Sequence, residues 1–375
     1  MTVPKGGLSD YSDVRRRSTP LGTFVSLYAG AGGMDIGFAL AGFAPVWSND
    51  FDAQAMETHG RVFKRLRDER PHLAKVTSEE VTGSITDIMA RGELPAPGCA
   101  DLVIGGPPCQ GFSVAGKMDP TDRRSEHVFH FFEVVEHVGP RAFVMENVKA
   151  LYENRRWSQI REALLQRASD LGYDTVMVCL NASHFGVPQA RERMFIIGVR
   201  GAQPELPVPT TEDAPPTVRA ALAQLPPFGS PGNDAVCTAK ITPARAPVMR
   251  RSPFAGMLFN GAGRPLDLDA PSLTLPASMG GNKTPIVDQD DLEGLAAPWV
   301  LGYHERLWNG GKPLRTVPSR LRRLTVQEAA AIQSFPLGME WAGPQSAQFR
   351  QIGNAVPPRL ALAVARAVEA SLKRR

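Results

Sequence analysis

The sequence predicts an α/β protein with a doubly wound, mostly parallel sheet and a second, smaller domain that is rich in loops. From residue 23 to about residue 200, short apolar runs alternate with amphipathic segments, the pattern of a parallel sheet covered by helices. After Gly201 this pattern stops, and eighteen of the 33 prolines fall between residues 201 and 320. Because proline interrupts helices and central strands, this second region is predicted to consist mainly of loops.

Six runs in the first region are predicted to be strands because they are short, apolar and bounded by turn residues. They cover residues 23–28, 45–48, 101–104, 142–145, 175–180 and 194–199. Residues 158–171 carry apolar side chains at helical spacing on one face, and Gly172 ends that helix. Near the C-terminus, Thr325 and Glu328 have the spacing of a capping box, and residues 359–372 are predicted to form the last helix.

The chain is expected to divide into three parts. Residues 1–20 are polar, contain the run Arg15-Arg-Arg17 and lack periodicity, so we expect a mobile basic tail. Residues 21–200 together with 322–375 are expected to form the larger domain, and residues 201–321 the smaller one.

The composition, with 43% hydrophobic and 21% charged residues in 375, is that of an ordinary globular protein. No apolar run is long enough to span a bilayer and no signal peptide is evident, so a cytoplasmic protein without a membrane partner is expected. The four cysteines lie far apart without CxxC spacing, which argues against a zinc site or a disulfide framework, and no metal is expected. The net charge of +4 permits a nucleic-acid partner.

The most informative stretch is Gly105-Gly-Pro-Pro-Cys-Gln-Gly-Phe-Ser113, which follows the predicted strand at residues 101–104. Two prolines stiffen the backbone just before Cys109. An isolated cysteine is most often a small buried hydrophobe. Here the sequence after the strand is polar and rich in glycine, and α/β folds place their chemistry where strands end. The pattern therefore favours Cys109 as a nucleophile.

A second candidate site follows the first strand, where Tyr28-Ala-Gly-Ala-Gly-Gly33 leads into a helix-like segment. Glycines allow a ligand to approach the backbone, and a helix N-terminus offers free N–H groups. Asp50 ends the second predicted strand, where a carboxylate can hold a ribose. A tight turn and a helix cap would explain the same residues. Nothing in this loop demands a pyrophosphate, so a nucleoside such as S-adenosylmethionine fits as well as a dinucleotide.

Further polar residues accompany two of the later strands. A carboxylate, Glu146, and an amide stand near the end of the run Ala142-Phe-Val-Met-Glu-Asn-Val148, and a buried carboxylate is costly unless it is paired or used. Arg191 and Arg193 alternate with strand period, so both can lie on one face. A structural carboxylate and a solvated strand edge are the simpler explanations. A thiol, a carboxylate and a guanidinium together suit covalent attack on a polarised heterocycle.

Taken together, these motifs resemble those of the C5-cytosine DNA methyltransferases. The matching segments are Tyr-Ala-Gly-Ala-Gly-Gly, Ser-Asn-Asp, Gly-Gly-Pro-Pro-Cys-Gln-Gly-Phe-Ser, Met-Glu-Asn-Val, Phe-Gly-Val-Pro-Gln-Ala-Arg-Glu-Arg, Arg-Leu-Thr-Val-Gln-Glu and Gln-Ile-Gly-Asn-Ala-Val-Pro-Pro. They occur in the family's order and cover about residues 23–200 and 322–365. The resemblance implies a Rossmann-like class I methyltransferase fold, with a target-recognition domain at residues 201–321.

The resemblance also implies transfer of a methyl group from S-adenosylmethionine to carbon 5 of a cytosine, leaving S-adenosylhomocysteine. Cys109 matches the nucleophile that adds to C6, and Glu146 the carboxyl that engages N3 and the exocyclic amine. Arg193 matches the residue that contacts the O2 side, with Arg191 as its partner in the motif. Because C5 and C6 are stacked inside a duplex, the base must be flipped out of double-stranded DNA.

The resemblance assigns the remaining candidate residues to two surfaces. Those expected to bind the cofactor are Tyr28, Ala29, Gly30, Gly32, Gly33, Asp50, Phe51, Ser84, Ile85, Pro108, Asn354 and Ala355. Those expected to bind DNA are Ser113, Lys117, Arg124, Thr274, Asn282, Lys283 and Thr284. For Lys117 a solvated loop is the simpler explanation, and an ordinary surface loop would also explain the last four. Two departures from the family pattern stand out: Tyr28 replaces a usual phenylalanine, and Ser84 replaces the aspartate that usually contacts adenine.

Two other functions would use much of the same pattern. A transfer-RNA methyltransferase on the same scaffold would have a different continuation of the nucleophile loop and a Cys-Phe-Thr tripeptide, and neither is present. A catalytically silent DNA-binding regulator would have lost the thiol or the acid, whereas Cys109, Glu146 and Arg193 are all in place. By analogy, we expect a monomeric, stand-alone enzyme of a restriction–modification system, associated with the nucleoid. A cognate endonuclease would share its system without forming a stable complex with it.

Overall fold

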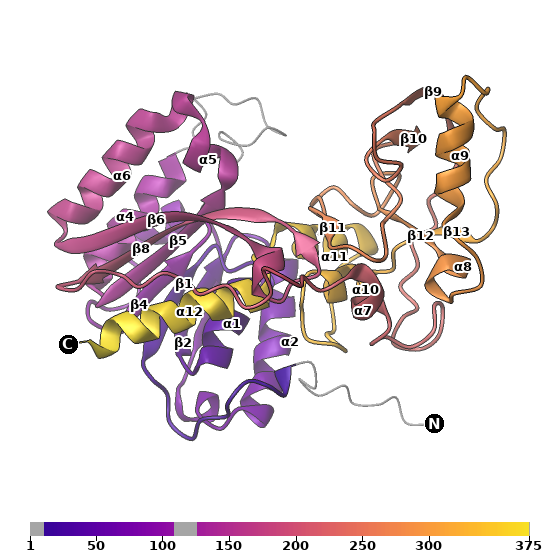
Figure 1. Ribbon diagram of the computed structural model, residues 1–375. Coiled ribbons are helices and arrows are strands. Elements are labelled where there is room, and N and C mark those ends of the chain that lie inside the picture. Colours follow the sequence, from indigo (N-terminus) through magenta and orange to yellow (C-terminus); the bar gives the residue numbers. More distant parts are fainter. Residues whose placement is uncertain (1–10, 109–125, 375) are drawn as a thin grey trace. The chain divides into compact units, whose positions relative to one another are not determined.

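The computed structural model describes residues 11–108 and 126–374, which form two compact units (Figure 1). Among the described residues, the larger unit holds 11–185, 191–210 and 355–374, and the smaller one holds 186–190 and 211–354. This division differs from the expected boundaries at three segments. Residues 201–210 group with the larger unit, whereas residues 186–190 and 322–354 group with the smaller one.

The larger unit is built on a seven-stranded sheet in the order β3-β2-β1-β4-β5-β8-β6. The strands are β1 (Thr23–Leu27), β2 (Ala44–Asp50), β3 (Glu79–Thr82), β4 (Leu102–Gly105), β5 (Ala142–Val148), β6 (Tyr173–Asn181) and β8 (Glu192–Arg200). The first five positions of this order pair in parallel, whereas β8 is antiparallel to both β5 and β6. The mostly parallel α/β sheet is therefore confirmed, as are all six predicted strands.

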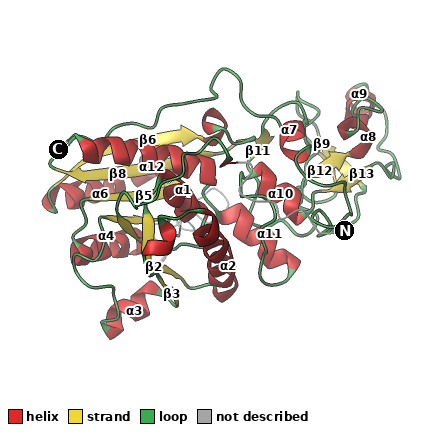
Figure 2. Ribbon diagram, turned by 90° about the horizontal axis from the view of Figure 1, so that it is seen from below, coloured by secondary structure: helices red, strands yellow, loops and turns green. Residues whose placement is uncertain are grey.

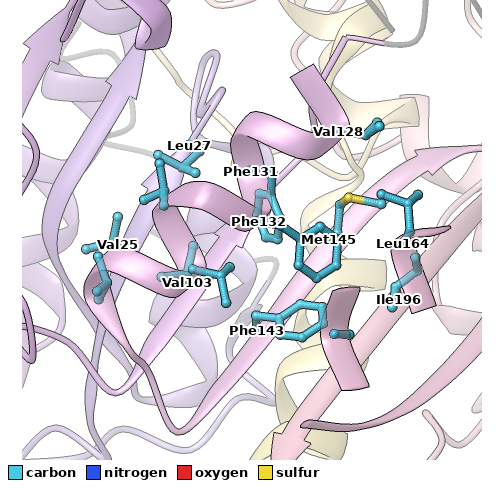
Figure 3. Close-up of a cluster of buried hydrophobic side chains, with 14 of the residues drawn as sticks. Val25, Leu27, Val103, Val128, Phe131, Phe132, Phe143, Met145, Leu164 and Ile196 are labelled. Carbon is cyan, nitrogen blue, oxygen red and sulfur yellow. The ribbon is translucent and has the colours of Figure 1, made fainter. Parts of the chain in front are cut away.

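Helices alternate with these strands along the chain, as Figure 2 shows for the larger unit. They are α1 (Gly33–Ala41), α2 (Ala53–Glu69), α3 (Ile85–Arg91), α4 (His127–Val138), α5 (Lys149–Glu153), α6 (Ser158–Asp170) and α12 (Pro358–Lys373), with a 3₁₀ turn at Ala182–Phe185. A hydrophobic core joins α4 and α6 to the sheet (Figure 3). In it, Phe143 of β5 contacts Phe131 and Phe132 of α4 in edge-to-face geometry, which suits the quadrupoles of aromatic rings.

The last helix, α12, packs tightly against α1. A Cβ added at Gly37 of α1 would lie 2.4 Å from the Cβ of Ala361, so only glycine permits this approach. Residues 11–20 also pack onto the larger unit: Tyr11 is fully buried beneath the guanidinium of Arg359, and Arg17 pairs with Glu369 at 2.7 Å. The expectation of a mobile tail is therefore wrong for residues 11–20, because an aromatic anchor and an ion pair hold them.

The smaller unit has short elements joined by loops (Figure 2). Its strands are β7 (Gln189–Ala190), β9 (Pro243–Val248), β10 (Met257–Phe259), β11 (Ser272–Leu273), β12 (Ile286–Asp288) and β13 (Leu321–Arg323). Its helices are α7 (Val218–Leu222), α8 (Gln289–Leu292), α9 (Trp299–Trp308), α10 (Val326–Ile332) and α11 (Gln345–Asn354). The predicted capping box is present: the Thr325 hydroxyl accepts from the Glu328 N–H, and the Glu328 carboxylate accepts from the Thr325 N–H, each at 3.0 Å.

The pairing of β12 with β13 explains why residues 322–354 belong with the smaller unit. β13 is antiparallel to β12, and Arg323 of β13 is buried and donates to the carbonyl of Thr284 at 2.6 Å. Within residues 11–108 and 126–374, no helix is long and apolar enough to cross a membrane.

Candidate functional site

The turn after β1 has a backbone conformation that few residues adopt. Tyr28, Gly30 and Gly32 all have positive φ, at 56°, 56° and 85°. Such a conformation costs little for glycine but is strained for tyrosine, and strain of this kind clusters at functional sites. A Cβ added at Gly30 would meet no atom within 4 Å, so open space lies beside the turn. Ala29 donates its N–H to Asn49, and Gly33 begins α1.

Asp50 ends β2 beside this turn. Its carboxylate accepts the N–H of Gly30 at 2.9 Å and that of Asp52 at 2.8 Å. Burial raises the pKa of Asp50, and the N–H donors offset only part of that effect. The next residue, Phe51, is 74% exposed, which is unusual for a ring of this size. The turn, the buried carboxylate and the exposed ring lie at the ends of β1 and β2, which pair in parallel in the larger unit.

The tyrosine that departs from the family pattern has its own partner. The Tyr28 hydroxyl lies 3.1 Å from Nδ1 of His127 at the start of α4, and the rings meet edge to face. Burial raises the pKa of Tyr28, and the nearby charges of Glu133 and Asp50 add to this rise. The hydroxyl therefore stays protonated at any pH the protein meets.

Ser84 and Ile85 follow the end of β3, the neighbour of β2 in the sheet. Ser84 precedes α3 and its hydroxyl is 2.6 Å from that of Thr86, while Ile85 is buried. Asn49, which sequence reasoning did not single out, holds this segment: its side-chain amide donates to the carbonyls of Val81 and Gly83, both at 2.9 Å. Asparagine at the tip of β2 thus braces the loop that leads from β3 to Ser84.

Glu146 and Arg193 are brought together by the antiparallel pairing of β5 with β8. Glu146 is 8% exposed, and its carboxylate lies 2.9 Å from Nε of Arg193. Arg191 is buried nearby, and its charge acts on the same carboxylate. Burial raises the pKa of Glu146, although both guanidinium groups pull it down. A Cβ at Gly106 would lie 2.9 Å from Oε2 of Glu146, so the glycine leaves room for this carboxyl.

The exit of β4 is held by a residue that sequence reasoning placed in a motif but gave no role. Asn147 is buried, donates to the carbonyl of Pro107 at 3.2 Å and accepts the N–H of Val148 at 2.9 Å. The partly buried Pro108 is the last residue described before the gap. Four residues with expected roles lie outside the described ranges: Cys109, Ser113, Lys117 and Arg124.

In the smaller unit, three of the four expected DNA-contact residues are exposed: Thr274, Asn282 and Lys283. Thr274 and Lys283 line a mainly apolar cavity of about 430 Å³, together with Arg264. Thr284 is fully buried, and its hydroxyl accepts the N–H of Gly280 at 2.9 Å. The expected DNA contact of Thr284 is therefore wrong, because this side chain is buried and forms a hydrogen bond within its own loop.

The two cofactor-site candidates near the C-terminus fall on either side of the unit boundary. Asn354 is exposed and ends α11 in the smaller unit, and Ala355 begins the last segment of the larger one. Within the described residues, no group of three or more His, Cys, Asp or Glu side chains is arranged to hold a metal ion.

Similarity to known proteins covers most of the chain and includes both units. A family model described as C-5 cytosine-specific DNA methylase matches residues 22–370. The type II methyltransferase M1.HphI of Haemophilus parahaemolyticus is 31% identical over 92% of this chain and 86% of its own length. M.AgeI of Thalassovita gelatinovora is 28% identical over 93% and 99%, respectively.

The fold of this chain also resembles those of solved structures. A protein described as a DNA modification methyltransferase encoded within an E. coli prophage superposes with a TM-score of 0.62, at 22% identity over 94% of this chain and 99% of that one. The S. pombe Dnmt2 methyltransferase superposes with a TM-score of 0.59, at 17% identity over 94% and 98%. The match of the family model and the identity to M1.HphI decide the family: the chain belongs to the C-5 cytosine-specific DNA methylases and is a DNA (cytosine-5-)-methyltransferase.

Proposed function

We propose that this enzyme methylates cytosine within a specific short sequence of duplex DNA, with S-adenosylmethionine as methyl donor, in a restriction–modification system. One observation carries the proposal: a buried, arginine-paired carboxylate, Glu146, stands at the end of β5, beside the strand whose exit leads in sequence to Cys109. The relatives M1.HphI and M.AgeI are named type II methyltransferases, which supports the system proposed here. The enzyme would act in the cytoplasm, where its proposed DNA substrate lies.

The residues after β1 and β2 fit a nucleoside cofactor. Open space beside Gly30, the buried Asp50 carboxylate and the exposed Phe51 ring offer room, a hydrogen-bond acceptor and an aromatic face. The chain would hold the cofactor through Tyr28, Ala29, Gly30, Gly32 and Gly33 at the methionine end, Asp50 at the ribose, and Phe51, Ser84 and Ile85 at the adenine. Pro108, Asn354 and Ala355 would complete the site. When bound, S-adenosylmethionine supplies an electrophilic methyl group on a sulfonium.

Cys109 is proposed as the nucleophile. Its thiolate would add to C6 of the flipped cytosine, and the electron pair of the C5–C6 bond then becomes available at C5. After C5 is methylated, loss of the C5 proton and expulsion of the thiolate restore the ring. Two other cysteines suit this role poorly: burial raises the pKa of Cys99 and, to about 11, that of Cys179, which leaves little thiolate.

Glu146 is proposed to engage N3 and the exocyclic amine of the cytosine. Burial raises the pKa of its carboxyl, which favours the protonated form that can donate a hydrogen bond to N3. A donor at N3 withdraws electrons from C6 as the thiolate adds there. Arg193 would contact the O2 side of the base. The positive charge of Arg191 would offset part of the rise that burial causes in the pKa of the Glu146 carboxyl.

The smaller unit is proposed to recognise the target sequence. Arg264 and Lys283 form no ion pair within the described residues and line the cavity beside Thr274, so their charges are available to phosphates or base edges. Asn282, next to Lys283, can read a base edge through its amide. Beyond the described residues, Ser113, Lys117 and Arg124 are proposed to contact the DNA backbone.

The experiment is bisulfite sequencing of a plasmid that expresses the protein. We expect complete methylation of one short motif, loss of this methylation in Cys109→Ser, and full methylation in the matched control Cys99→Ser. Absence of a methylated motif with the wild-type protein, or methylation that persists in Cys109→Ser, would contradict the proposal. Labelling of transfer RNA in place of DNA would select the RNA substrate instead.

A further inference from the structure

A buried histidine of α2 lies between two carboxylates close to the cofactor turn. His59 is completely buried, with Nε2 at 3.0 Å from Oδ2 of Asp35 in the first turn of α1. Its other ring nitrogen, Nδ1, lies 3.7 Å from Oε1 of Glu80 on β3. Neither Asp35, which is itself fully buried, nor His59 has been given a task by the fold or the proposed reaction.

Asp35 gathers further donors from the two strands that end at the site. The hydroxyl of Ser26 on β1 donates to its Oδ1 at 2.7 Å, and that of Ser48 on β2 to its Oδ2 at 3.2 Å. The cluster therefore joins five elements: β1, β2, β3, α1 and α2. Two of them deliver the proposed cofactor residues directly, since the Tyr28 turn follows β1 and Asp50 ends β2.

The histidine also touches the turn itself. A Cβ added at Gly32 would lie 3.0 Å from Cδ2 of His59, so the imidazole forms the floor of the turn at the position where φ is 85°. Phe63 stacks on the imidazole, with ring centroids 4.5 Å apart and planes inclined by 17°, and its ring also lies 3.4 Å from the same Cβ position. The imidazole thus has little freedom to move without moving Gly32 or Asp35.

The charge state of this cluster is set by its neighbours. Burial alone would lower the pKa of His59, but contact with Asp35 and Glu80 outweighs it and raises the pKa to about 9. Facing the ring are Asp35 from α1 and Glu80 from β3, and Arg67 on α2 acts on Glu80. His59 is therefore an imidazolium at neutral pH, and its charge compensates a carboxylate that has no access to water.

We propose that His59, held between Asp35 and Glu80, is a positioning residue for the cofactor: it fixes the first turn of α1 and the floor of the Gly30–Gly33 turn in the binding conformation. This inference rests on the proposed cofactor site. When the imidazolium loses its proton, Asp35 keeps an uncompensated buried charge, and the cluster must rearrange or take up a proton. The turn then loses its support, and affinity for the cofactor falls.

The test measures binding of S-adenosylhomocysteine by calorimetry between pH 7 and pH 10, for the wild type and for His59→Gln. Glutamine keeps an N–H donor for Asp35 but carries no charge. We expect the variant to bind at least tenfold more weakly at pH 7.5, with kcat at saturating cofactor within threefold of the wild type. Because the ligand's own amino group titrates in this range, the ratio of the two Kd values is the relevant quantity. We expect this ratio to fall toward one as pH rises through 9.

Two further variants separate positioning from mere stability. His72 is another buried histidine of this unit; its Nε2 lies 2.9 Å from the Ala39 carbonyl and burial lowers its pKa, so His72→Gln should leave the Kd unchanged. Glu80→Gln, at a partly exposed site, should move the alkaline loss of affinity to lower pH. Equal Kd values and equal pH profiles for wild type and His59→Gln would overturn the inference, as would a Glu80→Gln profile that does not move. A wild-type protein that binds no S-adenosylhomocysteine would instead overturn the proposed cofactor site.

Discussion

Replacement of Glu146 by glutamine tests the proposed chemistry most sharply within the described residues. Glutamine keeps the shape of the side chain next to Gly106 but can neither ionise nor deliver a proton to N3. If the carboxyl acts as a proton donor, the loss should be about 10²–10⁴-fold in kcat. That range corresponds to about 3–5 kcal/mol in the activation barrier.

The same substitution should not weaken the fold at neutral pH. Burial raises the pKa of Glu146 above its value in the unfolded chain, so the folded protein favours the neutral carboxyl. The contribution of this group to stability is present at low pH and is lost as pH rises through the folded pKa. Because glutamine is always neutral, the variant's melting temperature at pH 7.5 should match or exceed that of the wild type, and the wild type should gain on it as pH falls.

The assay is single-turnover transfer of a labelled methyl group to DNA, with S-adenosylhomocysteine binding as the control for an intact cofactor site. Glu153→Gln serves as a matched variant, because Glu153 is an exposed carboxylate paired with Lys149 at 3.4 Å. We expect Glu153→Gln to retain wild-type rates. If Glu146→Gln transferred methyl groups within threefold of the wild-type rate, the assigned role of the carboxyl would be refuted.

Three further outcomes follow from the geometry. Asn147→Ala removes the hydrogen bonds that this side chain makes to the Pro107 carbonyl and from the Val148 N–H. We expect about 2–5 kcal/mol lower stability in urea unfolding and a fall in kcat of about 10²-fold with unchanged cofactor affinity, and a wild-type kcat would contradict this. Lys283→Ala should make the negative slope of log K against log salt concentration for DNA binding less steep by about one, as measured by fluorescence anisotropy. An unchanged slope would show that Lys283 does not contact the DNA backbone. Tyr28→Phe loses only the contact with His127, so stability should change by less than about 1.5 kcal/mol and methyl transfer by less than threefold; a larger loss in either assay would give the hydroxyl a role.

Much of the larger unit could be predicted because its signals are local. Each of the six predicted strands is an apolar run between turn residues. The sequence could not show that Glu146 lies beside Arg193, because this contact depends on the sheet order, in which β8 pairs with β5 in antiparallel orientation. The strand β3 was missed because its residues, Glu79 to Thr82, are mostly exposed at the sheet edge and carry no apolar run. Patterns that depend on burial cannot detect a strand that is not buried.

The errors have a common cause, since they concern side chains whose partners are distant in sequence. Tyr11 and Arg17 looked like parts of a polar tail, but their partners Arg359 and Glu369 lie at the other end of the chain. Thr284 looked exposed beside Asn282 and Lys283, yet its hydroxyl accepts from the thiol of Cys237 at 3.6 Å, 47 positions earlier in the chain. The bracing roles of Asn49 and Asn147 could not be seen in the sequence either, because their acceptors, Val81 on β3 and Pro107 just after β4, are 32 and 40 residues away.

The central claim is that the thiol of Cys109 bonds covalently to C6 of a flipped cytosine. The most direct measurement incubates the enzyme and S-adenosylmethionine with duplex DNA that carries 5-fluorocytosine at the target position, where fluorine cannot leave as the C5 proton does. The account predicts an enzyme–DNA adduct that survives denaturation, maps to Cys109 by mass spectrometry and is absent from Cys109→Ser. A wild-type enzyme that methylates the unmodified duplex yet forms no adduct, or forms one at another residue, would contradict it.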